Sequence, residues 1–395
     1  MQRLDVIAGY SKAGPGVSRF PFTAEHEGAL TLLREWMTKA GLEVSLDDSG
    51  TLIGRREGSE TSRTLLLGSH QDSVPQGGKY DGIFGIVLSI TCLEYLKHQQ
   101  LPYAIEVLAF ADEEGVRFPT ALMGPRALAG TFDPDVLGMQ DKDGVTLTDA
   151  LQNFGLEAEN IVALKRNSDD ILGFIETHIE QGPVLESKGA PVGIVTAICG
   201  IERWMVKITG RAAHAGTTPM DLRYDALAAA AELISYVENL CLETEALVGV
   251  VGWLNVVPNA VNAVPGEVDL SIELRSSTDQ VRVNAGLGLK AFLQQLADRR
   301  GLTASSERTY SQSAVQCGGE LSDRLEEAAK AIGLKAPRLM SGATHDASAM
   351  SDLSRVAMLF VRCLNGVSHH GDESITSEDA GIAADVLIRF LEGFE

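Results

Sequence analysis

Hydrophobic side chains follow two different spacings along this chain. Short apolar runs at residues 64–67, 104–110 and 172–175 are typical of buried strands. Residues 29–40 place their apolar side chains at helical spacing, and residues 83–96 read as a helix that follows a Gly-rich turn. Strand-like and helix-like stretches therefore alternate, which predicts an α/β fold.

The pattern changes from about residue 199 onward. From Val268 to Leu274, hydrophobic and polar residues alternate strictly, as in a strand with one solvated face. Residues 204–208 read as another strand, and residues 223–241 and 281–296 read as helices. This β-α-β-α order indicates a small α+β domain.

Two amphipathic helices, at residues 322–332 and 378–391, follow this region and are expected to return the chain to the first domain. The length of 395 residues also fits two domains. We therefore predict a discontinuous outer domain of residues 1–198 and 313–395, with residues 199–312 inserted into it.

Polar residues follow the ends of three predicted strands in the outer domain. His70 ends the first, Asp112-Glu113-Glu114 follows the second, and Thr177-His178 follows the third. In open α/β sheets, functional sites form at the carboxyl ends of strands, so these side chains are expected to meet.

Two further Gly-rich segments carry residues of the same types, namely Asp81 in Gly77-Gly78-Lys79-Tyr80-Asp81-Gly82 and His369 in Gly366-Val367-Ser368-His369-His370. Histidine and carboxylate ligands suit zinc, manganese, cobalt or nickel. A two-metal hydrolase needs a bridging carboxylate, terminal ligands and a separate acid/base. Each motif alone is weak evidence, since a single histidine is more often structural; the joint pattern is what predicts a metal site.

The adjacent carboxylates Glu113 and Glu114 can divide the roles of base and metal ligand between them. In a regular strand the two side chains would point to opposite faces. The division therefore requires that residues 112–114 form an irregular turn.

Composition narrows the class of protein. The formal net charge of -21 argues against nucleic acid or an anionic membrane as partner, but not against a small anionic substrate bound at a local cationic site. Residues 1–10 show no basic region followed by an apolar run, so we expect no signal peptide there; no apolar run is long enough to span a membrane, and the five cysteines are scattered. We therefore expect a cytoplasmic protein with reduced thiols.

Seven segments together resemble the carbamoylase branch of the peptidase M20 metallohydrolases, which includes N-carbamoyl-L-amino-acid hydrolases, allantoate amidohydrolases and β-ureidopropionases. They are GSHQDSVPQGGKYDGIFG, FADEEGVRFP, HIEQGPVLE, GRAAHAGTTPM, VPNAVNAVPGEVDLSIELR, SGATHDA and GVSHHGDES. The resemblance runs nearly end to end. It implies a metallohydrolase domain with a central mixed sheet flanked by helices, and an inserted α+β lid and dimerisation domain.

The resemblance also implies two divalent metal ions per chain. One would be held by His70, Asp81 and His178, and the other by Asp81, Glu114 and His369, with Asp81 bridging. Glu113 would be the general base. His370, beside His369, is the alternative ligand.

For the substrate, the resemblance implies that His214 polarises the scissile carbonyl and that Asn262 and Arg275 bind a carboxylate, with Gln181 nearby. An arginine suits a carboxylate because its planar fork donates two hydrogen bonds. Arg275 also falls on the polar face of its predicted strand, although a surface salt bridge would explain it too. Thr344 stands where many members of this branch have glycine, and its side chain could reshape the specificity for substrate.

The expected reaction is hydrolysis of a C–N bond in an N-carbamoyl amino acid or in allantoate. An N-acyl amino-acid hydrolase or a dipeptidase could use the same centre. A metal-dependent binding protein without turnover is a remote alternative, which the presence of Glu113 disfavours. A homodimer is expected, and His214 could act within its own subunit or across the dimer.

Overall fold

The computed structural model describes residues 1–394 as two compact units. The first contains Met1–Thr196 and Gln316–Glu395, and the second contains Ala197–Val315. The chain leaves the first unit after residue 196 and returns to it at residue 316. The predicted boundaries lay after residues 198 and 312.

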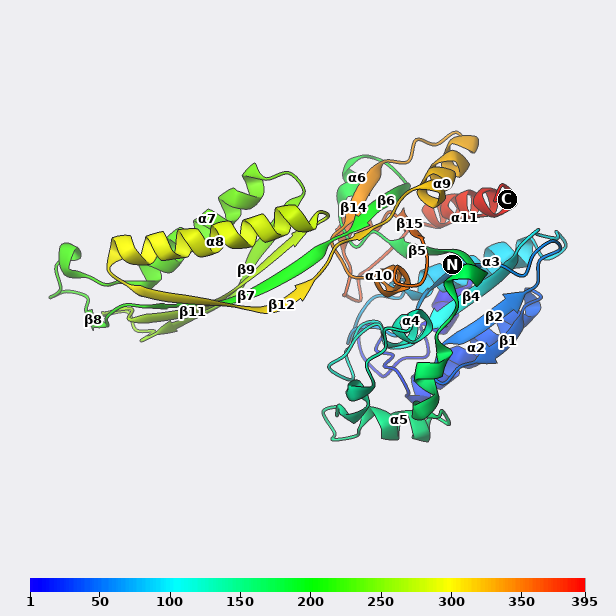
Figure 1. Ribbon diagram of the computed structural model, residues 1–395, viewed down its shortest axis with the longest axis horizontal. Helices are drawn as coiled ribbons and strands as arrows, with labels where there is room; N and C mark the ends of the chain where they lie inside the picture. The colour runs from blue at the N-terminus through cyan, green and yellow to red at the C-terminus, as the bar shows by residue number, and fades with distance from the viewer. Residues whose placement is uncertain (395) are drawn as a thin grey trace. The chain divides into compact units, whose positions relative to one another are not determined.

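A nine-stranded mixed sheet forms the centre of the first unit (Figure 1), so the predicted α/β class is confirmed. Its order is β1-β2-β4-β3-β5-β15-β6-β13, and β14 pairs with β6. Strands β4, β3, β5 and β15 run parallel, while β1, β2 and β6 pair antiparallel. The strands are β1 (Glu43–Leu46), β2 (Leu52–Arg56), β3 (Thr64–His70), β4 (Ala104–Phe110), β5 (Ile171–Ile179), β6 (Val192–Ile198), β13 (Val315–Gln316), β14 (Arg338–Ser341) and β15 (Val356–Val361).

Helices cover this sheet in two groups. The first group packs together around α3 and comprises α1 (Gln2–Ile7), α2 (Ala24–Lys39), α3 (Ile83–Tyr95), α9 (Glu320–Ala331) and α11 (Ser377–Glu392). The second packs around the contact between α4 (Met123–Ala129) and α10 (Asp346–Met350), with α5 (Leu147–Asn153) nearby. Because both faces are covered, β3 and β4 are buried along their whole length, which explains their unbroken apolar runs.

Helix α3 is apolar all round because it lies between the sheet and the outer helices α2 and α11. It approaches β5 so closely that a Cβ on Gly85 would lie 2.0 Å from the carbonyl oxygen of Thr177. Since α3 begins directly after Asp81 and β5 ends with the His178 segment, this contact helps to bring two predicted ligands together.

The second unit is a four-stranded antiparallel sheet in the order β12-β7-β11-β9, with α7 and α8 packed side by side on one face (Figure 1). Four strands replace the two that were predicted. The elements are β7 (Gly200–Thr209), α7 (Ala226–Glu243), β9 (Leu247–Val257), β11 (Glu267–Ser276), α8 (Asp279–Arg300) and β12 (Thr303–Gln312), with a short ribbon of β8 (Ala213–His214) and β10 (Ala263–Val264).

The alternation predicted for residues 268–274 is confirmed, because Val268, Leu270, Ile272 and Leu274 are buried against the helices. None of the described helices combines the length and apolarity needed to cross a lipid bilayer.

We predict that Gly85→Ala destabilises the protein by about 1–3 kcal/mol, because the carbonyl of Thr177 is main chain and cannot turn aside. Gly381→Ala in α11 is the matched control, since a Cβ there meets nothing within 4 Å. That control is expected to stabilise by about 0.4–1 kcal/mol. Chemical unfolding of the two variants measures the difference, and equal stabilities would contradict the close-packing argument.

Candidate metal centre

His70 and His178 lie at the carboxyl ends of the neighbouring parallel strands β3 and β5. Both strands run further than predicted, so the two histidines belong to the strands themselves. The Nδ1 atom of His70 lies 3.0 Å from the carbonyl oxygen of Asp72, and that of His178 lies 2.9 Å from the carbonyl oxygen of Ile179. A proton on each Nδ1 makes these hydrogen bonds and leaves Nε2 with a lone pair to bind a metal.

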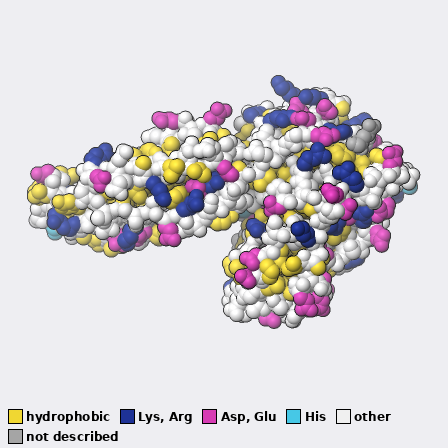
Figure 2. Space-filling model, in the orientation of Figure 1, with side chains coloured by type: hydrophobic (Ala, Val, Ile, Leu, Met, Phe, Trp, Pro, Cys, Tyr) yellow, Lys and Arg dark blue, Asp and Glu magenta, His cyan; other side chains and the backbone are white. Residues whose placement is uncertain are grey.

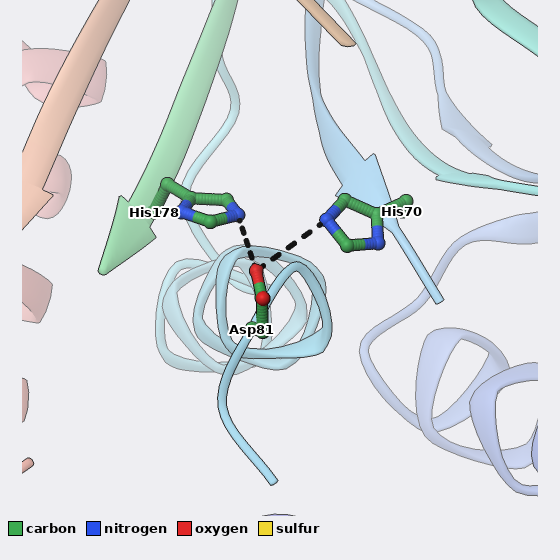
Figure 3. A group of neighbouring side chains, drawn as sticks. All are labelled: His70, Asp81 and His178. Atoms are coloured by element: carbon green, nitrogen blue, oxygen red, sulfur yellow. Dashed lines mark ion pairs between the residues drawn. The ribbon is translucent and has the colours of Figure 1, made fainter. Parts of the chain in front are cut away.

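Asp81 lies between these two imidazoles (Figure 3). Its Oδ1 atom is 3.1 Å from Nε2 of His178 and 3.7 Å from Nε2 of His70. The next residue, Gly82, has φ +63, and a Cβ there would lie 2.5 Å from the ring of His70. The glycine after Asp81 is therefore required by the closeness of the histidine.

A second group of ligand-type atoms shares Asp81. Nε2 of His369 lies 3.3 Å from Asp81 Oδ2 and 3.8 Å from Glu114 Oε1. One ligand atom from each of these three residues lies within 4.8 Å of the others. The neighbouring His370 is more exposed, and its Nδ1 accepts a hydrogen bond from the backbone of Asp372. His369, the preferred candidate, is thus the one placed beside Asp81.

The irregular turn that Glu113 and Glu114 need in order to divide the roles of base and metal ligand is present. Asp112, two residues after the end of β4, has φ +59, which prevents the strand from continuing. The carboxylate of Asp72 then accepts the backbone N–H groups of both glutamates, each at 3.1 Å. Sequence reasoning assigned no role to Asp72; its place two residues after His70 was the only available signal.

Burial sets the protonation of this centre. Burial and the nearby Asp81 and Asp72 carboxylates raise the pKa of Glu114 to about 8. Burial, and then the adjacent Glu114, raise the pKa of Glu113 well above its usual range. Burial opposes ionisation of Asp81 as well, but the nearby imidazoles of His178 and His369 lower its pKa overall. Carboxylates packed this closely repel one another unless cations lie between them.

The residues fit divalent cations. Asp81 Oδ1 and Glu114 Oε1 are buried and have no hydrogen-bond donor among the described residues. Buried polar atoms normally have a partner, and a metal ion is the partner that carboxylate oxygens and imidazole nitrogens share. The two overlapping groups would hold two ions bridged by Asp81.

A third buried group, Glu176, His178 and His345, has the right residue types but is already satisfied. Glu176 accepts hydrogen bonds from the Ser69 hydroxyl and the Ala347 backbone. His345 caps the start of α10 and also bonds to the Ser341 hydroxyl at 2.7 Å. We interpret this group as structural residues that hold His178 in position.

Two predicted substrate residues also belong to the first unit. Gln181 has φ +58, and its amide nitrogen donates to Asp81 Oδ2 at 3.1 Å and to Ser368 Oγ at 3.2 Å. Gln181 therefore contacts the shared carboxylate directly. Thr344 is half-buried in the loop that precedes His345.

The other three predicted substrate residues lie in the second unit, at opposite ends of its sheet. His214 pairs with Ala263 in the β8–β10 ribbon, which places it beside Asn262 at the Thr209 end of β7. Arg275 pairs with Ile201 at the other end of β7. The eight residue steps from Glu267 to Arg275 span about 27 Å of strand. One copy of the unit therefore does not bring all three residues to one small molecule.

Comparisons with known proteins agree with this geometry. Residues 66–393 match peptidase family M20/M25/M40. The chain is 38% identical to an N-carbamoyl-L-amino acid amidohydrolase of Geobacillus stearothermophilus, with 94% of this chain and 92% of that protein covered. It is also 38% identical to an allantoate deiminase of Arabidopsis thaliana, covering 99% and 81%.

A solved structure agrees as well. An amidase of the hydantoinase/carbamoylase family from Burkholderia multivorans superposes with a TM-score of 0.93 at 30% identity, covering 99% of this chain and 95% of that one.

We predict that zinc, manganese, cobalt or nickel ions raise the melting temperature of chelator-treated protein, because they neutralise the repelling carboxylates. An ion present at 100 times its Kd adds about 2.7 kcal/mol of stability. Asp81→Ala removes the ligand common to both groups and is expected to abolish the shift. A melting temperature that none of the four metals changes would contradict the site.

Proposed function

This chain belongs to peptidase family M20/M25/M40, and we propose that it is a two-metal amidohydrolase that cleaves the C–N bond of an N-carbamoyl amino acid or of allantoate. The observation that supports this best is the pair of ligand groups sharing Asp81, with the buried Glu113 close to both His70 and Glu114 and assigned here as the base rather than a ligand. A protein that only bound metal would have no need of that additional buried carboxylate.

We propose His70, Asp81 and His178 as ligands of one ion, and Asp81, Glu114 and His369 as ligands of the other. Two divalent ions held there would lower the pKa of water and polarise the carbonyl of the substrate. Glu113 accepts the proton of the attacking water and returns it to the leaving nitrogen. Burial and the adjacent Glu114 raise the pKa of Glu113, which makes it a stronger base than a free carboxylate.

His214 is suited to donate a hydrogen bond to the developing oxyanion. Its Nδ1 accepts the backbone N–H of Gly216 at 3.1 Å, so the neutral ring carries its proton on Nε2. Because His214 is exposed, that N–H is available to a ligand. A donor aimed at the oxyanion contributes to catalysis when it is fixed before the reaction.

Arg275 and Asn262 are proposed to bind the substrate carboxylate. Arg275 makes the ion pair that the alternative interpretation expected, with Nε and Nη2 both 2.7 Å from Glu273 Oε1. A substrate carboxylate would share this guanidinium with Glu273 or displace it.

A homodimer resolves the separation of Arg275 from His214 and Asn262. In a dimer, one chain can supply Arg275 and the partner can supply the ribbon residues, so that all meet one substrate. Strand β9 is the sheet edge best suited to the contact, because it exposes Val248, Val250, Trp253 and Leu254. Hydrophobic side chains are visible at the surface of this unit (Figure 2).

The five free cysteines support a cytoplasmic location.

The direct test is a panel of N-carbamoyl-L-amino acids, allantoate, N-acyl amino acids and dipeptides, with each metal restored in turn. We expect ureido substrates to be hydrolysed with release of ammonia. Glu113→Gln keeps the size but accepts no proton, so kcat should fall by about 10²–10⁴-fold. Bound metal, measured by elemental analysis, should stay unchanged in this variant.

Preference for N-acyl substrates or dipeptides would favour the second candidate function, which uses the same metal residues. Loss of a metal ion from Glu113→Gln would reverse the roles of Glu113 and Glu114.

Mixing two inactive variants tests the dimer. If His214 acts across subunits, a heterodimer of Glu113→Gln with His214→Ala contains one intact site and one doubly altered site. Random mixing should then restore about one quarter of the wild-type activity, as expected for a two-fold symmetric dimer. If the mixture stays inactive although mass measurements show heterodimers, then His214 acts within its own chain.

A further inference from the structure

A closed circuit of hydrogen bonds surrounds Asp81, and the buried Glu373 completes it. Oε1 of Glu373 accepts the backbone N–H groups of Tyr80 and Asp81, each at 3.0 Å. Oε2 of Glu373 accepts the hydroxyl of Ser368 at 2.9 Å. Glu373 therefore joins the loop that carries the shared aspartate to the loop that carries His369.

Gln181 closes the circuit on the opposite side. Its amide nitrogen lies 3.2 Å from the Ser368 oxygen and 3.1 Å from Asp81 Oδ2. The backbone of Asp81 is thus held by Glu373, and its Oδ2 atom is held by Gln181. That oxygen is the one that faces Nε2 of His369.

The backbone at Gly78, three residues before Asp81, leaves room for the side chain of Glu373. A Cβ on Gly78 would lie 2.0 Å from Glu373 Oε1 and 2.5 Å from its Cβ. Only glycine allows the carboxylate to reach the two backbone N–H groups. Glu373 itself is 3% exposed, so these N–H groups would have no other ready partner if it were removed.

We propose that Glu373 is a positioning residue for the second ion, the one assigned to Asp81, Glu114 and His369, and not for the ion assigned to His70 and His178. The first pair of histidines is held by strands β3 and β5 and by their own backbone hydrogen bonds. His369, by contrast, has φ +55 and lies in a loop that Glu373 connects to the Asp81 backbone and Gln181 connects to Asp81 Oδ2. The inference rests on the proposed two-metal function.

The test is metal binding rather than activity. Mn²⁺ is titrated calorimetrically into chelator-treated wild type and Glu373→Ala, and bound metal is counted by elemental analysis. Residues that support metal ligands from behind typically change affinity by about 10- to 100-fold. We expect a loss of that size for one ion only, in the pattern of a His369→Ala reference rather than a His178→Ala reference.

Glu180→Ala is the matched control. Glu180 is also buried, and its carboxylate likewise accepts two backbone N–H groups, those of Val184 and Leu185, at 2.7 and 2.9 Å. Neither of these contacts reaches Asp81. We expect this variant to bind both ions as wild type does, with any cost confined to stability.

Wild-type binding of both ions by Glu373→Ala would overturn the inference, as would a loss in the pattern of His178→Ala or an equal loss in Glu180→Ala. If Glu373→Ala does not fold by circular dichroism, Glu373→Gln replaces it. That variant keeps an acceptor for the backbone, and its amide N–H can donate to Ser368 Oγ, so Ser368→Ala is tested beside it: this variant removes the contact of Glu373 with the His369 loop and should lower second-ion affinity; unchanged affinity in Ser368→Ala overturns the inference. Fewer than two ions on the wild type would contradict the proposed function itself.

Discussion

Mutual repulsion among buried carboxylates around Asp81 is the constraint on which the rest of the centre depends. Asp72, Asp81 and Glu113 are buried and Glu114 is partly buried, and both glutamates have raised pKa values. Hydrogen bonds satisfy Asp72, which holds the Glu113–Glu114 turn. Oxygens of Asp81 and Glu114 keep no donor. The fold therefore brings together more carboxyl groups than its hydrogen bonds satisfy, and divalent ions bound among them would favour their charged forms.

Much of this arrangement was predictable because it follows from local rules. The buried apolar strands could be recognised, and the carboxyl ends of parallel strands meet, so His70 and His178 were expected to lie together. The need for a turn at Glu113 and Glu114 followed from strand geometry, and Asp112 provides it. His369 was preferred to His370 from its motif, and its imidazole does lie beside Asp81.

The unpredicted parts depend on contacts between distant segments. Glu373 reaches Asp81 across 292 positions of sequence and acts through the backbone, which leaves no pattern of residue types. Strands β9 and β12 were missed for a different reason. Both are sheet edges; β9 contains two glycines, and β12 is mostly polar, so neither shows strict alternation. The distance from Arg275 to His214 depends on strand register, which composition does not report.

The division of residues between the two units has a consequence for specificity. The candidate metal ligands are carried by one unit, and most of them are buried and hydrogen-bonded, so a substitution there disturbs several groups at once. His214, Asn262 and Arg275 lie on a separate sheet, at exposed or half-buried positions with few constraints. Changes on that sheet can alter which carboxylate or ureido group is held without disturbing the metal ligands. Relatives at 38% identity are named for an N-carbamoyl amino acid in one case and for allantoate in the other. In our proposal the reaction type belongs to the first unit, and the choice of substrate belongs to the assembly of two chains.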